Sequence, residues 1–194
     1  GTVTGVQTCA LPIYIKGKSR IMEARPYEER IGVAMLKKGL KLMIAESCTG
    51  GLIGHRITNI PGASNYYLGS ITAYAYETKE QLLQVRHTTL QQHGAVSRPT
   101  VLEMAEGVRK VLAGHYPIES TIGLAVTGIA GPGGATPTKP VGLVFIALST
   151  PGGAHVWEFH FTGSRLDVKE SATTAALKLL WEYLEDKDDE AVPS

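Results

Sequence analysis

The sequence predicts an α/β fold, a three-layer α/β/α sandwich around a mixed, mainly parallel sheet. Short apolar segments alternate with amphipathic ones along most of the chain, which is typical of strands that alternate with helices. Near the end, two apolar segments flank a Pro-Gly-Gly turn, and a long amphipathic segment follows them. The alternation favours parallel pairing, and the hairpin adds one antiparallel strand.

The first half of the chain gives helix and strand patterns in turn. Residues 26–38 carry apolar side chains at helical spacing, and Gly39 supplies a C-terminal stop. Residues 40–45 are predicted as a buried strand, and a helical pattern returns from Leu52 up to Pro61. We therefore expect a helix, a strand and a second helix in this order.

The middle of the chain repeats this pattern. Residues 66–75 are aromatic and β-branched and predict a strand, and residues 78–85 predict a helix. A loop over residues 93–97 then leads into an amphipathic helix at 99–112, and residues 118–126 form the next buried strand.

The last third begins with a loop that is long for a compact domain. Residues 127–140 are rich in Gly, Pro and Thr, and a connection of this length indicates function. The hairpin strands are predicted at 141–149 and 156–161, and the final helix at 164–184.

We expect one domain, over residues 23–186. Residues 1–22 are predicted to be a disordered or artefactual extension, because they lack periodicity and residues 6–13 resemble the translation of a sequencing adaptor. Residues 187–194 are predicted to be a flexible acidic tail.

Composition argues against several classes of partner. The chain has 194 residues, 43% hydrophobic content and a net charge of +1, with 19 scattered Lys and Arg against 18 Asp and Glu. Nucleic acid is therefore not an expected partner, and the uncharged runs are broken by Gly and Pro, so no membrane association is expected. Two cysteines without zinc-ligand spacing fit a cytoplasmic protein without a metal.

The candidate site begins at Ser47, where the strand at 40–45 gives way to a helix. Ser47, Cys48 and Thr49 would lie near backbone N–H groups that are unpaired within the helix, and these groups suit an anion or an oxyanion. The alternative is an ordinary Ser/Thr helix cap with glycines for tight packing. The 127–140 loop would emerge at the same edge of the sheet, so both segments would face one pocket.

Four ordered motifs resemble one family. AESCTGG at 45–51, AY…ETK at 73–79, HGAVS at 93–97 and TGIAGPGG…KPVG at 127–142 are similar to the C-terminal domain of the competence-damage protein CinA. The resemblance covers about residues 26–185. It implies deamidation of nicotinamide mononucleotide to nicotinate mononucleotide and ammonia, in pyridine-nucleotide salvage, with no metal or organic cofactor. It also implies a homodimer or larger homo-oligomer, to which Tyr66 and Tyr67 could contribute as exposed aromatics.

The resemblance also implies catalytic roles. Ser47 would be the nucleophile and Lys79 the base, which requires a lowered lysine pKa. Tyr74 could hydrogen-bond this dyad or the oxyanion, or it could be a core aromatic of a strand. N–H groups near Cys48 and Thr49 would form the oxyanion hole. Cys48 is expected to be a buried small residue, with a reactive thiol as the minor alternative.

Further residues would bind the nucleotide. Arg165 is the expected phosphate ligand, and a surface arginine without this role is the lesser alternative. Gly128 and Gly131 would let the backbone approach the substrate, Thr127 would contact it through its side chain, and Gly50 would contribute from the nucleophile turn.

Two departures from the family pattern and two other functions bear on this assignment. Tyr76 replaces a common Asn and Ser164 a common Asp, so we expect altered substrate binding. The main alternative is a non-catalytic nucleotide-binding module linked to competence or stress. Phosphoryl transfer would need carboxylates for Mg²⁺, and Glu46 is the only acid beside either glycine-rich segment.

Overall fold

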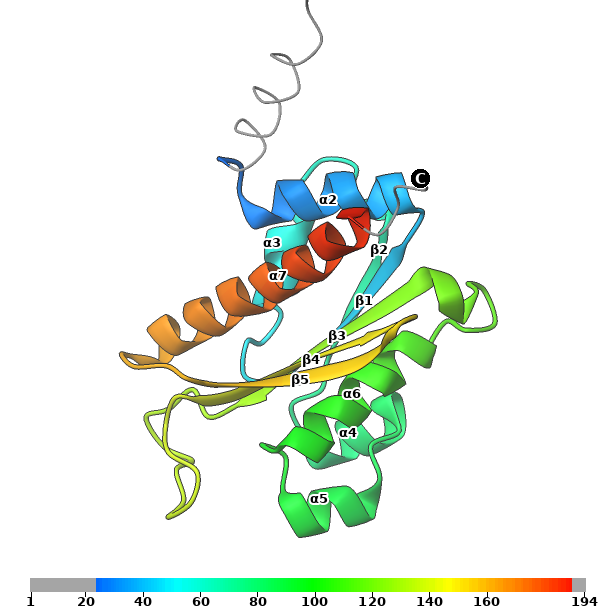
Figure 1. Cartoon of the computed structure of the whole chain (residues 1–194). Helices are drawn as coiled ribbons and strands as arrows, with labels where there is room; N and C mark the ends of the chain where they lie inside the picture. The colour runs from blue at the N-terminus through cyan, green and yellow to red at the C-terminus, as the bar shows by residue number, and fades with distance from the viewer. Residues whose placement is uncertain (1–23, 190–194) are drawn as a thin grey trace, which may run out of the picture.

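A computed structural model describes residues 24–189 and places a five-stranded sheet at the centre (Figure 1). The strand order is β2-β1-β3-β4-β5. β1 pairs in parallel with β2 and β3, whereas β4 is antiparallel to β3 and β5, so β4 alone runs against the others. The predicted mixed, mainly parallel sheet is confirmed. The strands are β1 (Lys41–Glu46), β2 (Tyr67–Thr72), β3 (Thr121–Gly128), β4 (Leu143–Thr150) and β5 (Gly153–His160).

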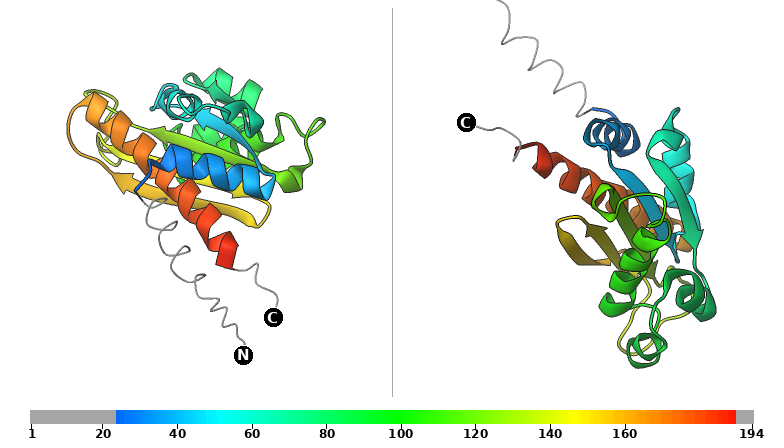
Figure 2. Two further views of the ribbon diagram at one scale, coloured as in Figure 1. Left: turned by 90° about the horizontal axis from the view of Figure 1, so that it is seen from above. Right: turned by 90° about the vertical axis from the view of Figure 1, so that its right-hand side faces the viewer.

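Helices cover both faces of the sheet and complete the three layers. One face carries α2 (Tyr27–Lys38), α3 (Leu52–Thr58) and α7 (Arg165–Asp189), and Figure 2 shows α2 and α7 side by side over it. The other face carries α4 (Tyr76–Leu83), α5 (His87–His93) and α6 (Arg98–Lys110). Two short 3₁₀ helices span Ala63–Asn65 and Ile118–Ser120.

The central strands are buried on both faces, which explains their continuous apolar sequences. Ile44 and Leu124 pack under α2, α3 and α7, whereas Met43 and Ala125 pack under α6. Side chains alternate between the faces because a strand has a period of two. Two apolar layers therefore hold the sheet rigid, and its strand ends can position a site.

Some expectations from sequence were wrong. Tyr66 is not an exposed aromatic, because only 1% of it is accessible and it packs in the core under α2. The segment His87–His93 forms α5, which was not expected because it offers few apolar side chains for a helical pattern. The strand expected at 66–75 covers only Tyr67–Thr72; Ala73 still donates its N–H to the Glu46 carbonyl at 2.8 Å, and α4 begins at Tyr76.

Both expected terminal extensions lie largely outside the described residues. The extension at 1–22 falls wholly outside them, whereas α7 continues past Leu184 through residues 187–189 of the expected tail. Within the described residues, no helix combines the length and apolar character needed to cross a bilayer.

Candidate active site

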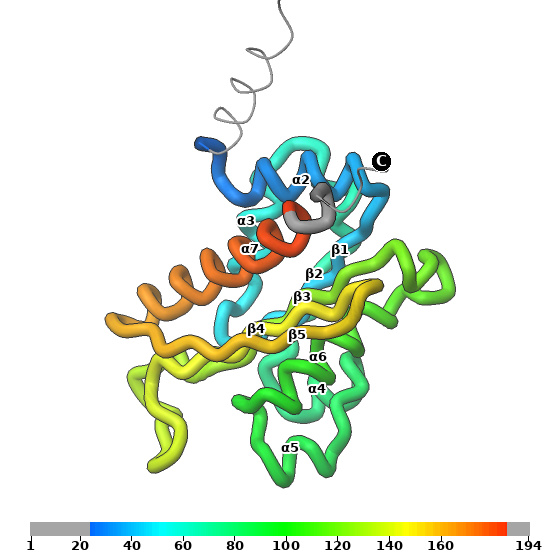
Figure 3. Tube along the Cα trace, viewed as in Figure 1, coloured from blue at the N-terminus to red at the C-terminus, as the bar shows by residue number. Residues whose placement is uncertain are grey.

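A cavity of about 280 Å³ opens at the carboxyl ends of β1 and β3. Figure 3 shows the segment between β3 and β4 projecting from this end of the sheet, beside the start of α7. Four segments contribute to the wall of this cavity. They are the turn that begins at Ser47, which we call the nucleophile turn, the start of α4, the segment before α6 and the loop after β3. The lining residues are Ser47, Cys48, Tyr74, Lys79, Ala95, Val96, Thr127, Gly128, Ile129, Ala130, Gly131, Gly133, Gly134 and Arg165.

Ser47 and Lys79 meet at this cavity, although 32 positions separate them in the sequence. The Lys79 Nζ lies 3.2 Å from the Ser47 Oγ. Ser47 stands directly after β1, and its N–H donates to the Val126 carbonyl of the neighbouring strand at 3.1 Å. The sheet therefore fixes the backbone of Ser47, and α4 positions Lys79.

The ammonium group of Lys79 has no exposed surface, and its donors are directed to backbone oxygens. Nζ donates to the Ala73 carbonyl at 2.6 Å and lies 3.4 Å from the Tyr74 carbonyl. Burial lowers the pKa of Lys79 below its ordinary value of 10.5, because desolvation penalises the charged form. In the neutral amine, two N–H groups can serve the carbonyls, which leaves the lone pair for the Ser47 hydroxyl.

Glu46 has a role that the sequence analysis missed. Its carboxylate is fully buried and accepts hydrogen bonds from the Thr49 hydroxyl at 2.7 Å and from three backbone N–H groups, those of Gly51 (3.0 Å), Ile53 (3.1 Å) and Gly54 (2.9 Å). The expectation that the N–H groups at the start of α3 face the site is therefore wrong. A carboxylate just before a glycine-rich helix start is the signal that could have revealed it.

The other residues of the nucleophile turn divide between the cavity and the interior. Cys48 lines the cavity but is only 5% exposed, and burial raises the pKa of its thiol to about 12. The raised pKa favours the expected buried small residue over the alternative of a reactive thiol. Thr49 is fully buried with its hydroxyl on Glu46, and Gly50 adopts a φ of +64° on the exposed side of the turn. Neither Thr49 nor Gly50 lines the cavity.

Tyr74 and Arg165 form a pair at the cavity. Tyr74 is 61% exposed, so it is not a core strand aromatic. Its hydroxyl accepts a hydrogen bond from Arg165 Nη2 at 2.8 Å, and Arg165 Nη1 donates to the Gly131 carbonyl at 2.6 Å. The guanidinium is thereby oriented by a side chain on one flank and by the loop on the other, and it keeps N–H groups for an anion.

The glycine-rich loop approaches the hairpin closely. A Cβ at Gly128 would lie 2.8 Å from the Leu143 carbonyl, and Gly131 has a φ of +81°. Thr127 lines the cavity, but its hydroxyl donates to the Ala95 carbonyl at 2.8 Å. The Ala95 N–H in turn donates to the Tyr76 hydroxyl at 3.2 Å. Both polar groups of the Ala95 peptide are thus occupied by neighbouring elements.

The two departures from the family pattern lie behind the cavity wall. Tyr76 is not among the lining residues and instead supports Ala95, so its ring does not narrow the cavity. Ser164 caps α7: its Oγ accepts the Asp167 N–H at 3.3 Å, and its own N–H donates to the Asp167 carboxylate at 2.7 Å. This reciprocal cap fixes the start of the helix that carries Arg165.

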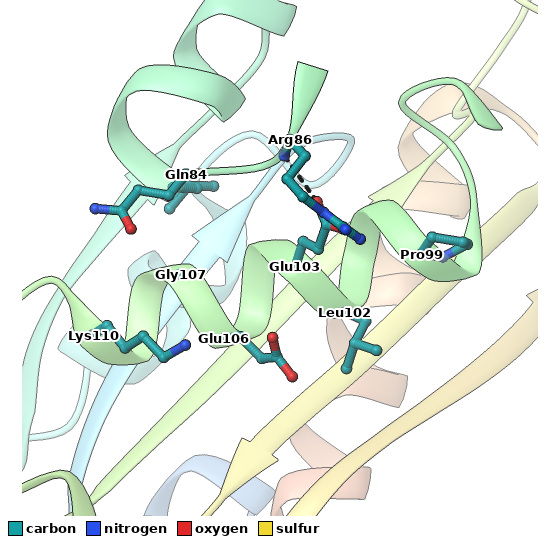
Figure 4. A pocket seen from close by; sticks show the side chains of 9 residues that line it. Gln84, Arg86, Pro99, Leu102, Glu103, Glu106, Gly107 and Lys110 are labelled. Atoms are coloured by element: carbon teal, nitrogen blue, oxygen red, sulfur yellow. Dashed lines mark hydrogen bonds and ion pairs between the residues drawn. The ribbon is translucent and has the colours of Figure 1, made fainter. Parts of the chain in front are cut away.

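A second hollow, of about 340 Å³, lies on α6 away from these groups (Figure 4). Arg86 and Glu103 form an ion pair across it, and Glu103 also accepts the Thr89 hydroxyl. In the part of the chain that the structure describes, no serine or cysteine lines this hollow, so its acidic and basic side chains have no nucleophile to activate. We therefore assign the candidate site to the cavity at Ser47. Over residues 24–189, no group of three or more His, Cys, Asp or Glu side chains is arranged to hold a metal ion.

Comparison with known proteins identifies relatives of this chain. Residues 24–184 match the family described as the CinA C-terminal domain. A putative competence-damage inducible protein of Desulforamulus reducens is 48% identical over 160 residues, which cover 82% of this chain and 37% of that protein. A CinA-like protein of Desulfotalea psychrophila is 43% identical over 154 residues, covering 79% and 36%. The chain thus spans little more than a third of these relatives.

Solved structures agree with the fold. A CinA superfamily protein from Klebsiella pneumoniae has a TM-score of 0.75 and 32% identity, with 84% of this chain and 99% of that chain covered. The competence/damage inducible protein CihA from Agrobacterium tumefaciens has a TM-score of 0.71 and 35% identity, with coverages of 82% and 95%.

Proposed function

The chain belongs to the CinA C-terminal domain family, and on that premise we propose that it is an amidohydrolase that deamidates nicotinamide mononucleotide. The products are nicotinate mononucleotide and ammonia. The contact between Ser47 and Lys79 carries the proposal. A serine hydroxyl 3.2 Å from a buried lysine whose pKa is lowered is the arrangement that activates a nucleophile without metal.

In the acylation step, neutral Lys79 accepts the hydroxyl proton while Ser47 Oγ bonds to the carboxamide carbon. The resulting oxyanion is stabilised by the backbone N–H group of Cys48, which lines the cavity, because Thr49 is fully buried and the N–H groups further along the turn are bonded to Glu46. Lys79 then donates the proton to the departing nitrogen, and ammonia leaves. An acyl ester of Ser47 remains.

In the deacylation step, Lys79 removes a proton from water, and the hydroxide oxygen bonds to the ester carbon. Collapse of the second tetrahedral intermediate breaks the bond to Ser47, whose oxygen recovers the proton from Lys79. Arg165 binds the phosphate, and Tyr74 orients Arg165 through its hydroxyl. The cycle consumes one water and releases one ammonia, and it needs no organic cofactor.

The test compares wild type with Ser47→Ala, Lys79→Ala and Lys79→Arg for release of ammonia and nicotinate mononucleotide in the presence of EDTA. We expect metal-independent activity in the wild type and losses of at least a thousandfold in all three variants. Arginine keeps the positive charge but does not deprotonate, so Lys79→Arg separates a base from a structural cation. Activity retained in Lys79→Arg would refute the dyad.

The second candidate is a nucleotide-binding module of the CinA type without turnover. The names of the relatives, which refer to competence and damage, favour keeping it. Binding of nicotinamide mononucleotide by folded wild type without ammonia release would replace the amidase with this function. We also propose a cytoplasmic location, a role in pyridine-nucleotide salvage and a homo-oligomer; light scattering of the purified chain tests the last of these.

A further inference from the structure

Lys169 lies over the turn that carries the proposed nucleophile. It is one helical turn after Arg165 on α7, and a Cβ built at Gly50 would be 3.5 Å from its Nζ. Gly50 closes the nucleophile turn by donating its N–H to the Ser47 carbonyl at 3.1 Å. The ammonium of Lys169 is therefore separated from Ser47 by a single tight turn.

This ammonium has no anionic partner within residues 24–189, although Lys169 is half-buried. Other basic side chains at this end of the sheet do donate to protein groups: Arg165 to the Gly131 carbonyl and the Tyr74 hydroxyl, and Lys139 to the His93 carbonyl. A long lysine stem can be covered by the protein while its ammonium stays open to solvent and to an anion that arrives from it. Lys169 thus differs from its neighbours in having its charge available.

The charge of the proposed substrate favours a second cation near Arg165. A phosphate monoester carries about −1.5 to −2 charges at neutral pH. Among the described residues no carboxylate lines the cavity, and since Lys79 has to be neutral to act as a base, Arg165 is the one fixed positive charge that they contribute to the lining. Two of its nitrogens already donate to protein groups. Arg165 alone therefore compensates the phosphate only in part.

We propose that Lys169 and Arg165 together form a two-cation subsite for the phosphomonoester of the nucleotide, with Lys169 as a substrate-binding residue outside the chemical step. Residues four apart on a helix lie on one face, about 6 Å apart, which suits two cations around one phosphate. The four-carbon stem lets the ammonium move from the turn to the anion. The inference rests on the proposed function for the identity of the nucleotide.

The probe is ribose 5-phosphate, which has the phosphate but no amide to hydrolyse. Its binding is measured by calorimetry on wild type, Lys169→Ala, Lys169→Arg and Lys178→Ala. Lys178 is the matched control, because it is an exposed lysine of the same helix whose ammonium lies 3.5 Å from Glu182. We expect about tenfold weaker binding in Lys169→Ala, near wild-type binding in Lys169→Arg, and no change in Lys178→Ala.

Turnover provides an independent readout. In Lys169→Ala, KM for nicotinamide mononucleotide should rise about tenfold with kcat within twofold of wild type, and the phosphate-free riboside should be turned over as by wild type. A lysine whose stem merely covers apolar surface would leave all of these values unchanged.

The outcomes separate the two proposals. Equal affinity of Lys169→Ala and wild type for ribose 5-phosphate, or no binding by wild type, overturns the subsite even if ammonia is released. Loss of ribose 5-phosphate binding in Lys169→Ala, restored by arginine, supports the subsite even if wild type releases no ammonia, in which case only the amidase assignment fails.

Discussion

Replacement of Glu46 is the most demanding test of how the nucleophile turn is held. In Glu46→Ala, the Thr49 hydroxyl and the N–H groups of Gly51, Ile53 and Gly54 lose their common acceptor. A donor left without a partner in the interior costs about 1–3 kcal/mol. Four such donors, partly compensated by water entering the vacated space, predict a loss of about 4 kcal/mol in the free energy of unfolding.

Glu46→Gln separates the loss of one oxygen from the loss of the whole group. The Gln carbonyl can take the place of Oε2, which accepts from Thr49, Gly51 and Ile53, whereas its NH₂ group would face the Gly54 N–H. The hydrogen bond from the Gly54 N–H and the long one from the Ser70 hydroxyl, at 3.4 Å, are then lost, and two donors oppose each other at Gly54, so we expect a loss of about 2 kcal/mol.

The assay is urea denaturation followed by circular dichroism, with the midpoints compared at equal m-values. Glu182→Ala is the control, because Glu182 is 47% exposed and makes one surface pair with Lys178. That pair contributes at most about 0.5 kcal/mol. The reasoning is refuted if Glu46→Ala is no less stable than Glu182→Ala, or if the glutamine variant is less stable than the alanine variant.

Three further predictions concern the chemistry. Cys48→Ala should keep at least a third of wild-type kcat, because a thiol with a pKa of about 12 is protonated at neutral pH; loss of activity comparable to Ser47→Ala would point to a cysteine nucleophile. As the pH increases, kcat/KM should rise with the deprotonation of a base whose pKa is below 10.5, because burial lowers the pKa of Lys79. This rise should be absent in Lys79→Ala. A rise in the wild type with a pKa at or above 10.5 contradicts the assignment of Lys79 as the base. Tyr74→Phe frees Arg165 from its phenolic partner and should raise KM several-fold more than it lowers kcat; an effect on kcat alone would place Tyr74 in the chemical step instead.

The layers of the fold were predictable because each central strand reads as a continuous apolar run. Residues 40–45 and the residues before Thr127 predict strands that are buried on both faces. The Pro-Gly-Gly turn predicts the hairpin. Tyr66 was misjudged because two adjacent tyrosines give no indication of which one faces inward. The helix α5 has few apolar residues, so its existence depends on tertiary contacts that no local pattern displays.

For the site, sequence reasoning identified the segments but not how their polar groups pair. Ser47 and Lys79 were linked through the family motifs, since no spacing rule brings together residues 32 positions apart. The hydrogen bond from Thr127 to Ala95 and the one from Arg165 to Tyr74 are likewise long-range in sequence. Pairings of this kind depend on loop conformation, and loop conformation is what local propensity describes least.

The position of Glu46 determines where positive charge can come from in this site. A strand-to-helix turn ordinarily offers the N–H groups of the helix start to an anion, but here a buried carboxylate accepts three of them and places a negative charge at that end of α3. A phosphate would be repelled from the same place. Positive charge for the anion then has to come from a different element, and α7 carries Arg165 and Lys169 one turn apart. By the same logic, activation of Ser47 cannot depend on the α3 dipole and must come from Lys79, whose burial favours the neutral amine. The site thus uses Lys79 as a buried base for the chemical step and the α7 cations Arg165 and Lys169 for binding. Variants of Lys79 should therefore lower kcat, whereas variants of the two α7 residues should raise KM.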